Sequence, residues 1–153
     1  MNPCHPFDQK CEVYQDYQRS TIKLKDPKGA SKSTYTATNK SKTVIVSLCV
    51  DGCLMKGNHL KKCDFLVLNC TEKTAHFIEL KGRDVNEACA QLISSIKELY
   101  PKIKPFGYNS VYAKLALSRA PQVPTKAYLD LKNHMKSLNG DAAFQQKKFT
   151  EFF

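Results

Sequence analysis

Two acids and a lysine, Asp64, Glu79 and Lys81, lie in apolar segments that otherwise resemble buried strands. Glu79 and Lys81 are separated by one residue, so on a strand both side chains point to the same face. Asp64 opens the preceding apolar segment. A hairpin turn centred on Thr71 and Glu72 places Asp64 opposite Glu79, and a turn centred one residue further along places it opposite Lys81. An odd-length loop or a bulge would move Asp64 to the other face.

Two carboxylates and an ammonium group at one strand end suit the hydrolysis of a phosphodiester. Carboxylates bind hard divalent cations such as Mg²⁺ or Mn²⁺, and the main-chain carbonyl of Leu80 can supply a further oxygen. The metal polarises the phosphodiester and lowers the pKa of a water molecule, and Lys81 orients or deprotonates that water. The alternative is a structural ion cluster. However, a charged pair in a strand covered on both faces is costly unless it has a function.

Hydropathy periodicity indicates the elements that position these residues. The apolar helix is expected to begin after Asp84, with Glu87 completing a capping box, and to end at Pro101. His76 is expected on the face opposite to Glu79, as a structural histidine. The predicted order is a short helix within residues 6–20, strands over 44–50, 63–69 and 76–81, a helix over 85–100, a strand over 110–118 and a helix over 127–138.

This order predicts an α/β or α+β fold, with a central mixed four-stranded sheet flanked by helices. The passage from residue 76 to residue 118 suits a right-handed crossover. The length of 153 residues fits a single domain over the whole chain. Residues 20–43, rich in Lys, Ser and Thr, are interpreted as a loop, or as a polar strand around 34–38. Residues 141–153 are interpreted as a basic and aromatic tail, for which a helix is the expected structure.

The spacing of Asp64 and the Glu79-Leu80-Lys81 triplet resembles the PD-(D/E)xK motif of restriction-endonuclease-like nucleases. The resemblance covers roughly residues 44–118 and is greatest to the small VRR-Nuc, Holliday-junction-resolvase and RecB-like branches. It implies a metal-dependent nuclease, with DNA favoured over RNA, that acts in repair, recombination or conflict between phage and host. It also implies a homodimer or a partner protein. Cys63 stands where the family often has proline.

The resemblance also implies auxiliary residues. The family's additional acid has two candidates here, Glu12 in the predicted first helix and Asp51 at the end of the first strand, and the sequence does not choose between them. Gln91 in the long helix matches a glutamine of the family. Counting about 100° per residue, however, places Gln91 on the polar side of that helix.

The formal net charge is +10, with 24 Lys and Arg against 14 Asp and Glu. Such an excess favours a polyanionic partner, because lysine and arginine release counterions from phosphates. The positions expected near the mouth of the site, where a phosphate backbone would pass, are Lys56, Lys61, Lys62, Arg83 and Arg119. The alternative is a solvated basic surface. A non-catalytic nucleic-acid-binding module on the same fold would carry the same charge.

The longest apolar run, residues 44–50, is too short to span a bilayer. The first residues contain neither a basic nor an apolar region, so no secretion signal is expected. The cysteine count of 7 is odd, which predicts free thiols in a reducing cytoplasm. A cysteine-rich zinc-binding adaptor is the less favoured alternative, because no pair of CxxC elements is present.

Overall fold

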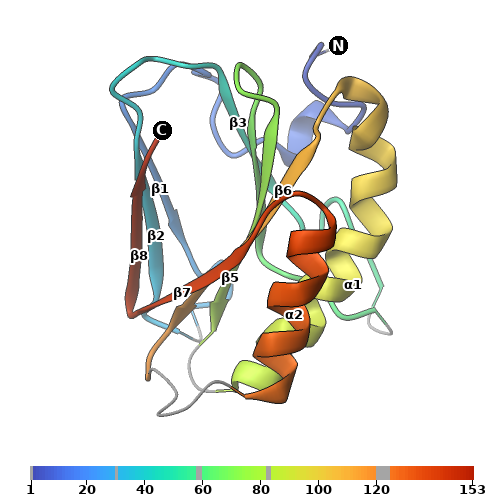
Figure 1. Cartoon of the computed structure of the whole chain (residues 1–153). Helices are drawn as coiled ribbons and strands as arrows, with labels where there is room; N and C mark the ends of the chain where they lie inside the picture. Colours follow the sequence, from blue (N-terminus) through green and yellow to red (C-terminus); the bar gives the residue numbers. More distant parts are fainter. Residues whose placement is uncertain (1, 30, 58–59, 82–83, 120–124) are drawn as a thin grey trace.

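The computed structural model describes residues 2–29, 31–57, 60–81, 84–119 and 125–153, with the backbone alone at position 81. The chain forms three layers: a five-stranded sheet lies between a three-stranded sheet and a layer of two helices (Figure 1). The elements in chain order are η1 (Gln9–Cys11), β1 (Thr21–Lys25), β2 (Thr34–Thr38), β3 (Ile45–Cys49), β4 (Phe65–Asn69), β5 (Thr74–Lys81), α1 (Val85–Ile103), η2 (Lys104–Phe106), β6 (Ser110–Leu117), α2 (Lys126–Ser137), β7 (Ala142–Gln146) and β8 (Lys148–Phe152).

The middle sheet has the strand order β3-β4-β5-β6-β7. Strands β3, β4 and β5 form an antiparallel meander, whereas β6 and β7 run parallel to β5. Helix α1 connects β5 to β6, α2 connects β6 to β7, and both helices cover the same face of the sheet (Figure 1). The predicted mixed sheet with flanking helices is therefore confirmed in general terms. The expectation of four strands is wrong, because the sheet contains five.

Helix α1 begins where the capping box predicted. The Asp84 carboxylate accepts a hydrogen bond of 3.0 Å from the N–H of Glu87. The helix continues to Ile103, so the expectation that Pro101 ends it is wrong. The carbonyl that loses its donor at Pro101 belongs to Lys97, which is exposed, and water can satisfy it there. Within the described ranges, no helix combines the length and the apolar composition needed to cross a bilayer.

The tail after α2 forms two strands instead of a helix. Strand β7 pairs with β6 at the edge of the middle sheet, and β8 pairs in parallel with β2 of the second sheet. Lys147, between them, has a left-handed φ of 63° and redirects the chain from one sheet to the other. In β8 the side chain of Phe149 is buried and its neighbours Lys148 and Thr150 are exposed. This alternation is typical of a strand and differs from the spacing of buried residues on a helix.

The Lys/Ser/Thr-rich segment 20–43 contains two strands joined by a turn. Strand β2 confirms the polar strand expected around residues 34–38, and β1 pairs with it in antiparallel orientation. Inward side chains of this second sheet, including Leu24, Tyr35 and Phe149, pack against the middle sheet. The side chains that alternate with these inward residues point outward. The alternation of apolar and polar residues in β1 and β2 is typical of a sheet with one buried face.

The predicted first helix is wrong. Within residues 6–20 only η1 is helical, and the chain then runs beside the free edge of β3. The N–H of Val13 donates to the Ser47 carbonyl at 2.8 Å, and the N–H of Ile45 donates to the Tyr17 carbonyl at 2.8 Å. Pairing with an open sheet edge satisfies these backbone groups without a helix.

Two disulfides attach this N-terminal segment to the rest of the molecule. Cys4 is bonded to Cys70, and Cys11 is bonded to Cys53. The expectation of free thiols throughout is therefore wrong for these four cysteines. It holds for the remaining cysteines, Cys49, Cys63 and Cys89. Disulfides are rare in a reducing cytosol, so the cysteine argument for a cytoplasmic location no longer applies and that location stays a prediction.

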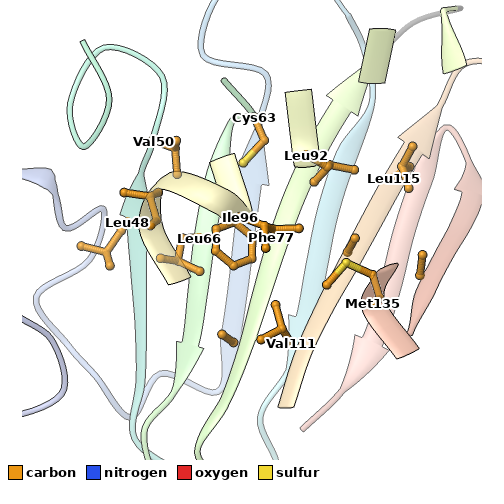
Figure 2. Close-up of a cluster of buried hydrophobic side chains, with 14 of the residues drawn as sticks. Leu48, Val50, Cys63, Leu66, Phe77, Leu92, Ile96, Val111, Leu115 and Met135 are labelled. Atoms are coloured by element: carbon orange, nitrogen blue, oxygen red, sulfur yellow. The ribbon is translucent and has the colours of Figure 1, made fainter. Parts of the chain in front are cut away.

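Apolar side chains cover both faces of the middle sheet. On the helix side, Leu66 and Phe77 pack against Leu92 and Ile96 of α1 (Figure 2). On the other side of the middle sheet, the neighbouring strand residues Phe65, Val67 and Ile78 face the second sheet. Because side chains alternate along a strand, Glu79 belongs to the same side as Phe77, where α1 lies.

Candidate active site

Asp64 and Glu79 are cross-strand neighbours at one end of the middle sheet. The register pairs Phe65 of β4 with Ile78 of β5. Asp64, immediately before β4, therefore lies opposite Glu79 of β5. The N–H of Asp64 donates to the Ile78 carbonyl at 3.1 Å and continues this ladder. The turn centred on Thr71 and Glu72 therefore sets the register, and the alternative with Asp64 opposite Lys81 does not occur.

Both carboxyl groups are buried. The exposed fraction is 7% for Asp64 and 3% for Glu79. The N–H of Leu80 donates to Asp64 Oδ2 at 2.9 Å. Burial raises the pKa of Asp64 to about 6; the hydrogen bonds from Leu80 and with Glu79 oppose this rise, and the carboxylates of Asp26 and Asp51 add to it. The pair thus includes an acid that changes its protonation state near neutral pH.

The third residue of the motif continues β5 in its backbone. Position 81 pairs with Leu117 of β6. The Lys81 side chain and the whole of Arg83 lie outside the part of the chain that the structure describes. Their predicted roles therefore remain predictions, as does the role of the Leu80 carbonyl as a metal ligand.

Of the two candidate auxiliary acids, Asp51 lies beside the pair. It follows β3, next to Val50, whose N–H donates to the Asp64 carbonyl at 3.0 Å. Its carboxylate forms ion pairs with Lys28 at 2.9 Å and with Lys62 at 3.5 Å. Asp51 is also close enough to raise the pKa of Asp64 through its negative charge.

Glu12 has a different environment. Its side chain is 1% exposed and lies 3.7 Å from His5 Nε2. The Tyr17 hydroxyl donates to Glu12 Oε2 at 2.7 Å. The backbone of Glu12 forms an isolated bridge with Leu48 at the edge of β3. Its carboxylate thus contacts His5 and Tyr17 of the N-terminal segment, so Glu12 stabilises that segment rather than joining Asp64.

Gln91 is more buried than its position in the helix predicted. It lies one turn before Ser95, whose Oγ accepts a hydrogen bond of 2.7 Å from the N–H of Cys63, next to Asp64. Gln91 is half-buried, and its Oε1 is buried with no hydrogen-bond partner within the described residues. The expectation that it lies on the polar side of the helix is therefore wrong. Helix α1 contacts the residue next to Asp64 through Ser95, near the middle of the helix.

The basic residues predicted near the site divide into two groups. Lys56, Lys61 and Arg119 are exposed and available to a phosphate backbone. Lys62 has a side chain only 12% exposed, is paired with Asp51, and donates a hydrogen bond to the Gly57 carbonyl. It is therefore a structural partner of the acidic end rather than a free phosphate contact.

Asp26 and Lys28, in the turn between β1 and β2, were missed by sequence reasoning. Lys28 pairs with Asp51, and Asp26 acts electrostatically on Asp64. They belong to a polar segment far from Asp64 in sequence, and no local spacing indicates their proximity.

A second buried charged cluster lies on the opposite face of the middle sheet. Lys114, 7% exposed, forms an ion pair with Glu151, and the Tyr35 hydroxyl donates to the other Glu151 oxygen at 2.5 Å. His76 stacks on Tyr112 with ring centroids 5.2 Å apart. This confirms the prediction that His76 faces away from Glu79. A lysine within the apolar segment 110–118 was a signal for this cluster that sequence reasoning did not use.

Asp64 and Glu79 fit the donor set of a magnesium site. Among the described residues, no group of three or more His, Cys, Asp or Glu side chains could hold a metal ion. Mg²⁺, however, is commonly held by one or two carboxylates and keeps several waters. The pair therefore suits Mg²⁺ or Mn²⁺, whereas zinc sites use three or four side-chain ligands. The zinc-adaptor hypothesis has no supporting cluster in the described residues.

Comparison with known proteins adds no assignment. No family model matches the chain, and no curated protein and no solved structure is significantly similar to it. The functional argument therefore depends on the residues and their geometry.

Proposed function

We propose that this protein is a divalent-metal-dependent nuclease that hydrolyses phosphodiester bonds, with DNA as the favoured substrate. One observation carries the proposal: Asp64 and Glu79 are directly opposite each other, both buried, at the end of β5. Adjacent buried acids are costly to ionise unless a cation lies nearby, and such arrangements concentrate at functional sites.

The connectivity around the pair supports a restriction-endonuclease-like core over roughly residues 44–118. Strands β3, β4 and β5 form an antiparallel meander, and α1 then crosses to the parallel strand β6. This is the order that the resemblance implies for the central part of such a fold. The family's first helix has no counterpart among the described residues, and the second sheet covers the face of the middle sheet away from α1 and α2 (Figure 1).

Each residue has a proposed role. Asp64 and Glu79, with the Leu80 carbonyl, would hold Mg²⁺ or Mn²⁺, which supplies Lewis-acid activation of the phosphate and of the attacking water. Lys81 would orient that water and stabilise the negative charge that develops on the phosphate. Asp51 keeps Lys28 and Lys62 at the same end of the sheet.

The first test is cleavage of several substrates. The purified full chain is incubated with supercoiled plasmid, linear duplex, branched DNA and RNA, with Mn²⁺, with Mg²⁺ and with EDTA. We expect cleavage of at least one substrate that requires the metal. Failure of all substrates in both metals would contradict the proposal. Asp130→Asn, which changes an exposed acid on α2, is the matched control for the site variants.

Two site variants should fail differently. Glu79→Gln removes a charged metal ligand, so metal affinity should fall and a higher Mn²⁺ concentration should restore part of the activity. Lys81→Ala leaves both carboxylates in place, so metal binding should persist while the chemical step slows by orders of magnitude. Single-turnover cleavage and calorimetric Mn²⁺ titration separate the two effects. A Lys81→Ala protein that cuts as fast as the parent would show that the motif assignment is wrong.

The competing function is a non-catalytic nucleic-acid-binding module on the same fold. It is favoured by the hydrogen bond from the Leu80 N–H, which gives Asp64 a structural role at the end of the strand ladder. Such a module would bind nucleic acid with and without metal and would cut none of the four substrates. Homodimer formation, or a partner protein that supplies specificity, belongs to either function, and light scattering with and without nucleic acid tests the dimer.

A further inference from the structure

The outward face of the second sheet has an unusual composition. The register places Thr21, Thr38 and Phe152 in one row across β1, β2 and β8. The next outward row is Lys23, Thr36 and Thr150, and the third is Lys25, Thr34 and Lys148. We call these nine residues the lysine–threonine face. It contains three lysines, five threonines and one aromatic ring, and no acid.

The charged and aromatic groups of this face are available to a partner. Lys23, Lys25 and Lys148 are exposed, and none of them forms an ion pair with an acid in the described ranges. Phe152 is 73% exposed, which is the largest exposure of the exposed large hydrophobic residues in the described chain. The Nζ atom of Lys40 lies 5.5 Å from the centroid of its ring and adds a positive charge beside it. The face thus combines unpaired positive charge with an accessible aromatic ring.

The face also leads towards the candidate active site. Strand β1 ends at Lys25, and the turn that follows contains Lys28, which pairs with Asp51 at 2.9 Å. The Lys25 row is therefore the row nearest in the chain to the acidic end, and the Phe152 row lies at the other end of the strands. Figure 1 shows β1, β2 and β8 side by side, on the side of the middle sheet away from the helices.

We propose that the lysine–threonine face binds single-stranded nucleic acid and directs it towards Asp64 and Glu79. Lysines spaced by two residues along β1 neutralise phosphates, and threonine hydroxyls donate hydrogen bonds to phosphate oxygens. Phe152 stacks on a base, as aromatic residues do in proteins that bind single strands. A ring at a sheet surface stacks on an unpaired base, whereas the bases of a duplex are already stacked on each other; this selects a single strand over a duplex.

The direction towards the site rests on the proposed nuclease function, whereas the binding does not. The test is therefore a binding measurement without metal. Fluorescence anisotropy of a labelled single-stranded oligothymidylate and of a duplex of the same length is followed with the full chain in EDTA, over a series of salt concentrations. We expect the single strand to bind more tightly than the duplex, with an affinity that falls as salt increases.

The first variant combines Lys23→Thr, Lys25→Thr and Lys148→Thr. Threonine already occupies the neighbouring positions and favours strands, so the sheet should persist. Loss of three phosphate contacts should lower the salt slope of single-strand binding by about 2, at about 0.7 per contact, and weaken binding at least tenfold at low salt. The matched control combines Lys97→Gln, Lys104→Gln and Lys136→Gln, which removes the same charge from exposed positions on or beside the helices and should change binding little.

The second variant, Phe152→Leu, keeps an apolar side chain and removes the stacking ring. Because Phe152 is so exposed, its replacement should leave folding intact, so this variant tests the face even if the triple variant is unstable. We expect about tenfold weaker binding of the single strand and no change for the duplex.

Equal weakening by the helix-side control and by the face variant would overturn the proposal, because it would show that only total charge matters. Unchanged binding by Phe152→Leu, tighter binding of the duplex than of the single strand, or no binding at low salt would also overturn it. The two proposals can fail separately. A protein that cuts nucleic acid but binds normally in both variants retains the nuclease function without this face. A protein that binds through the face and never cuts retains the face without the nuclease.

Discussion

The two faces of the middle sheet each carry a buried charged cluster, and the clusters differ in the sign of the charges that lie next to each other. On the face away from the helices, the Lys114 ammonium group forms an ion pair with the Glu151 carboxylate, which also accepts a hydrogen bond from the Tyr35 hydroxyl. At the other cluster, Asp64 lies next to Glu79 and has no ion-pair partner among the described residues. Its carboxylate accepts a hydrogen bond from the N–H of Leu80.

This difference separates a structural cluster from a candidate functional one. A buried ion pair with its hydrogen bonds satisfied has no need for a further ligand, and its sensitive property is stability. Two adjacent buried acids lower the stability when they ionise, and a bound cation relieves that cost. We therefore expect substitutions in the first cluster to change folding and substitutions in the second to change cleavage.

The largest effect should come from comparing the same substitution in both clusters. Glu79→Gln should lower the single-turnover cleavage rate by about a thousandfold, equivalent to about 4 kcal/mol of transition-state free energy. Glu151→Gln, measured at a temperature where the variant is folded, should cleave at the parent rate. Equal loss of cleavage in both variants would remove the distinction between the clusters.

The next effect concerns stability. Lys114→Met removes the ammonium group and leaves the Glu151 carboxylate without its cation, so we expect a loss of about 3 kcal/mol in the free energy of unfolding. Urea denaturation followed by circular dichroism measures it. A double variant with Glu151→Gln should recover part of the loss, because no unpaired charge then remains. A Lys114→Met protein as stable as the parent would mean that this ion pair is not needed for folding.

Removal of the charge of Asp64 in the cluster with Glu79 should increase the free energy of unfolding, whereas removal of the Lys114 charge should lower it. Asp64→Asn keeps an oxygen that can accept the Leu80 N–H and removes a carboxylate whose ionisation is disfavoured by burial. In EDTA at pH 8, the variant should be more stable than the parent by about 2 kcal/mol. Exposed Asp130→Asn should change stability little. Destabilisation by Asp64→Asn would indicate that the carboxylate is satisfied in the metal-free protein.

The smallest effect is the pH dependence of stability, where the clusters act in opposite directions. The pKa of Asp64 in the folded protein, about 6, lies above the 3.8 that is usual for an unfolded chain, so stability in EDTA should rise by about 1 kcal/mol as pH falls from 7 to 5. Burial, followed by the Lys114 charge, lowers the pKa of His76 well below 6.5. The unfolded state then takes up the proton first, and stability falls as pH decreases below 6.5.

Two variants separate these contributions. Asp64→Asn should remove the gain, so that its stability falls more steeply on acidification than that of the parent. His76→Gln should remove the loss, so that its stability falls less steeply. Denaturation curves at pH 7, 6 and 5 give both slopes. Parallel pH profiles for the three proteins would contradict the assigned pKa shifts.

The local patterns of the sequence determined much of the scaffold. Apolar β-branched runs predicted β3, β4, β5 and β6, and the Asp84 capping box predicted the start of α1. The turn centred on Thr71 and Glu72 allowed Asp64 to be placed opposite Glu79. Such predictions succeed because strand alternation, helical periodicity and capping involve residues that are close in the chain.

Tertiary structure decided the remainder. The parallel pairing of β8 with β2, the disulfides of the N-terminal segment and the ion pair of Lys28 with Asp51 all join segments distant in the sequence. Gln91 is half-buried because tertiary packing fixes the rotation of α1 about its axis, whereas a helical wheel gives only its position relative to the apolar stripe of the helix. A local pattern states which residues are buried, whereas the partner of each residue depends on which distant segments share the same core and how their backbone edges are satisfied.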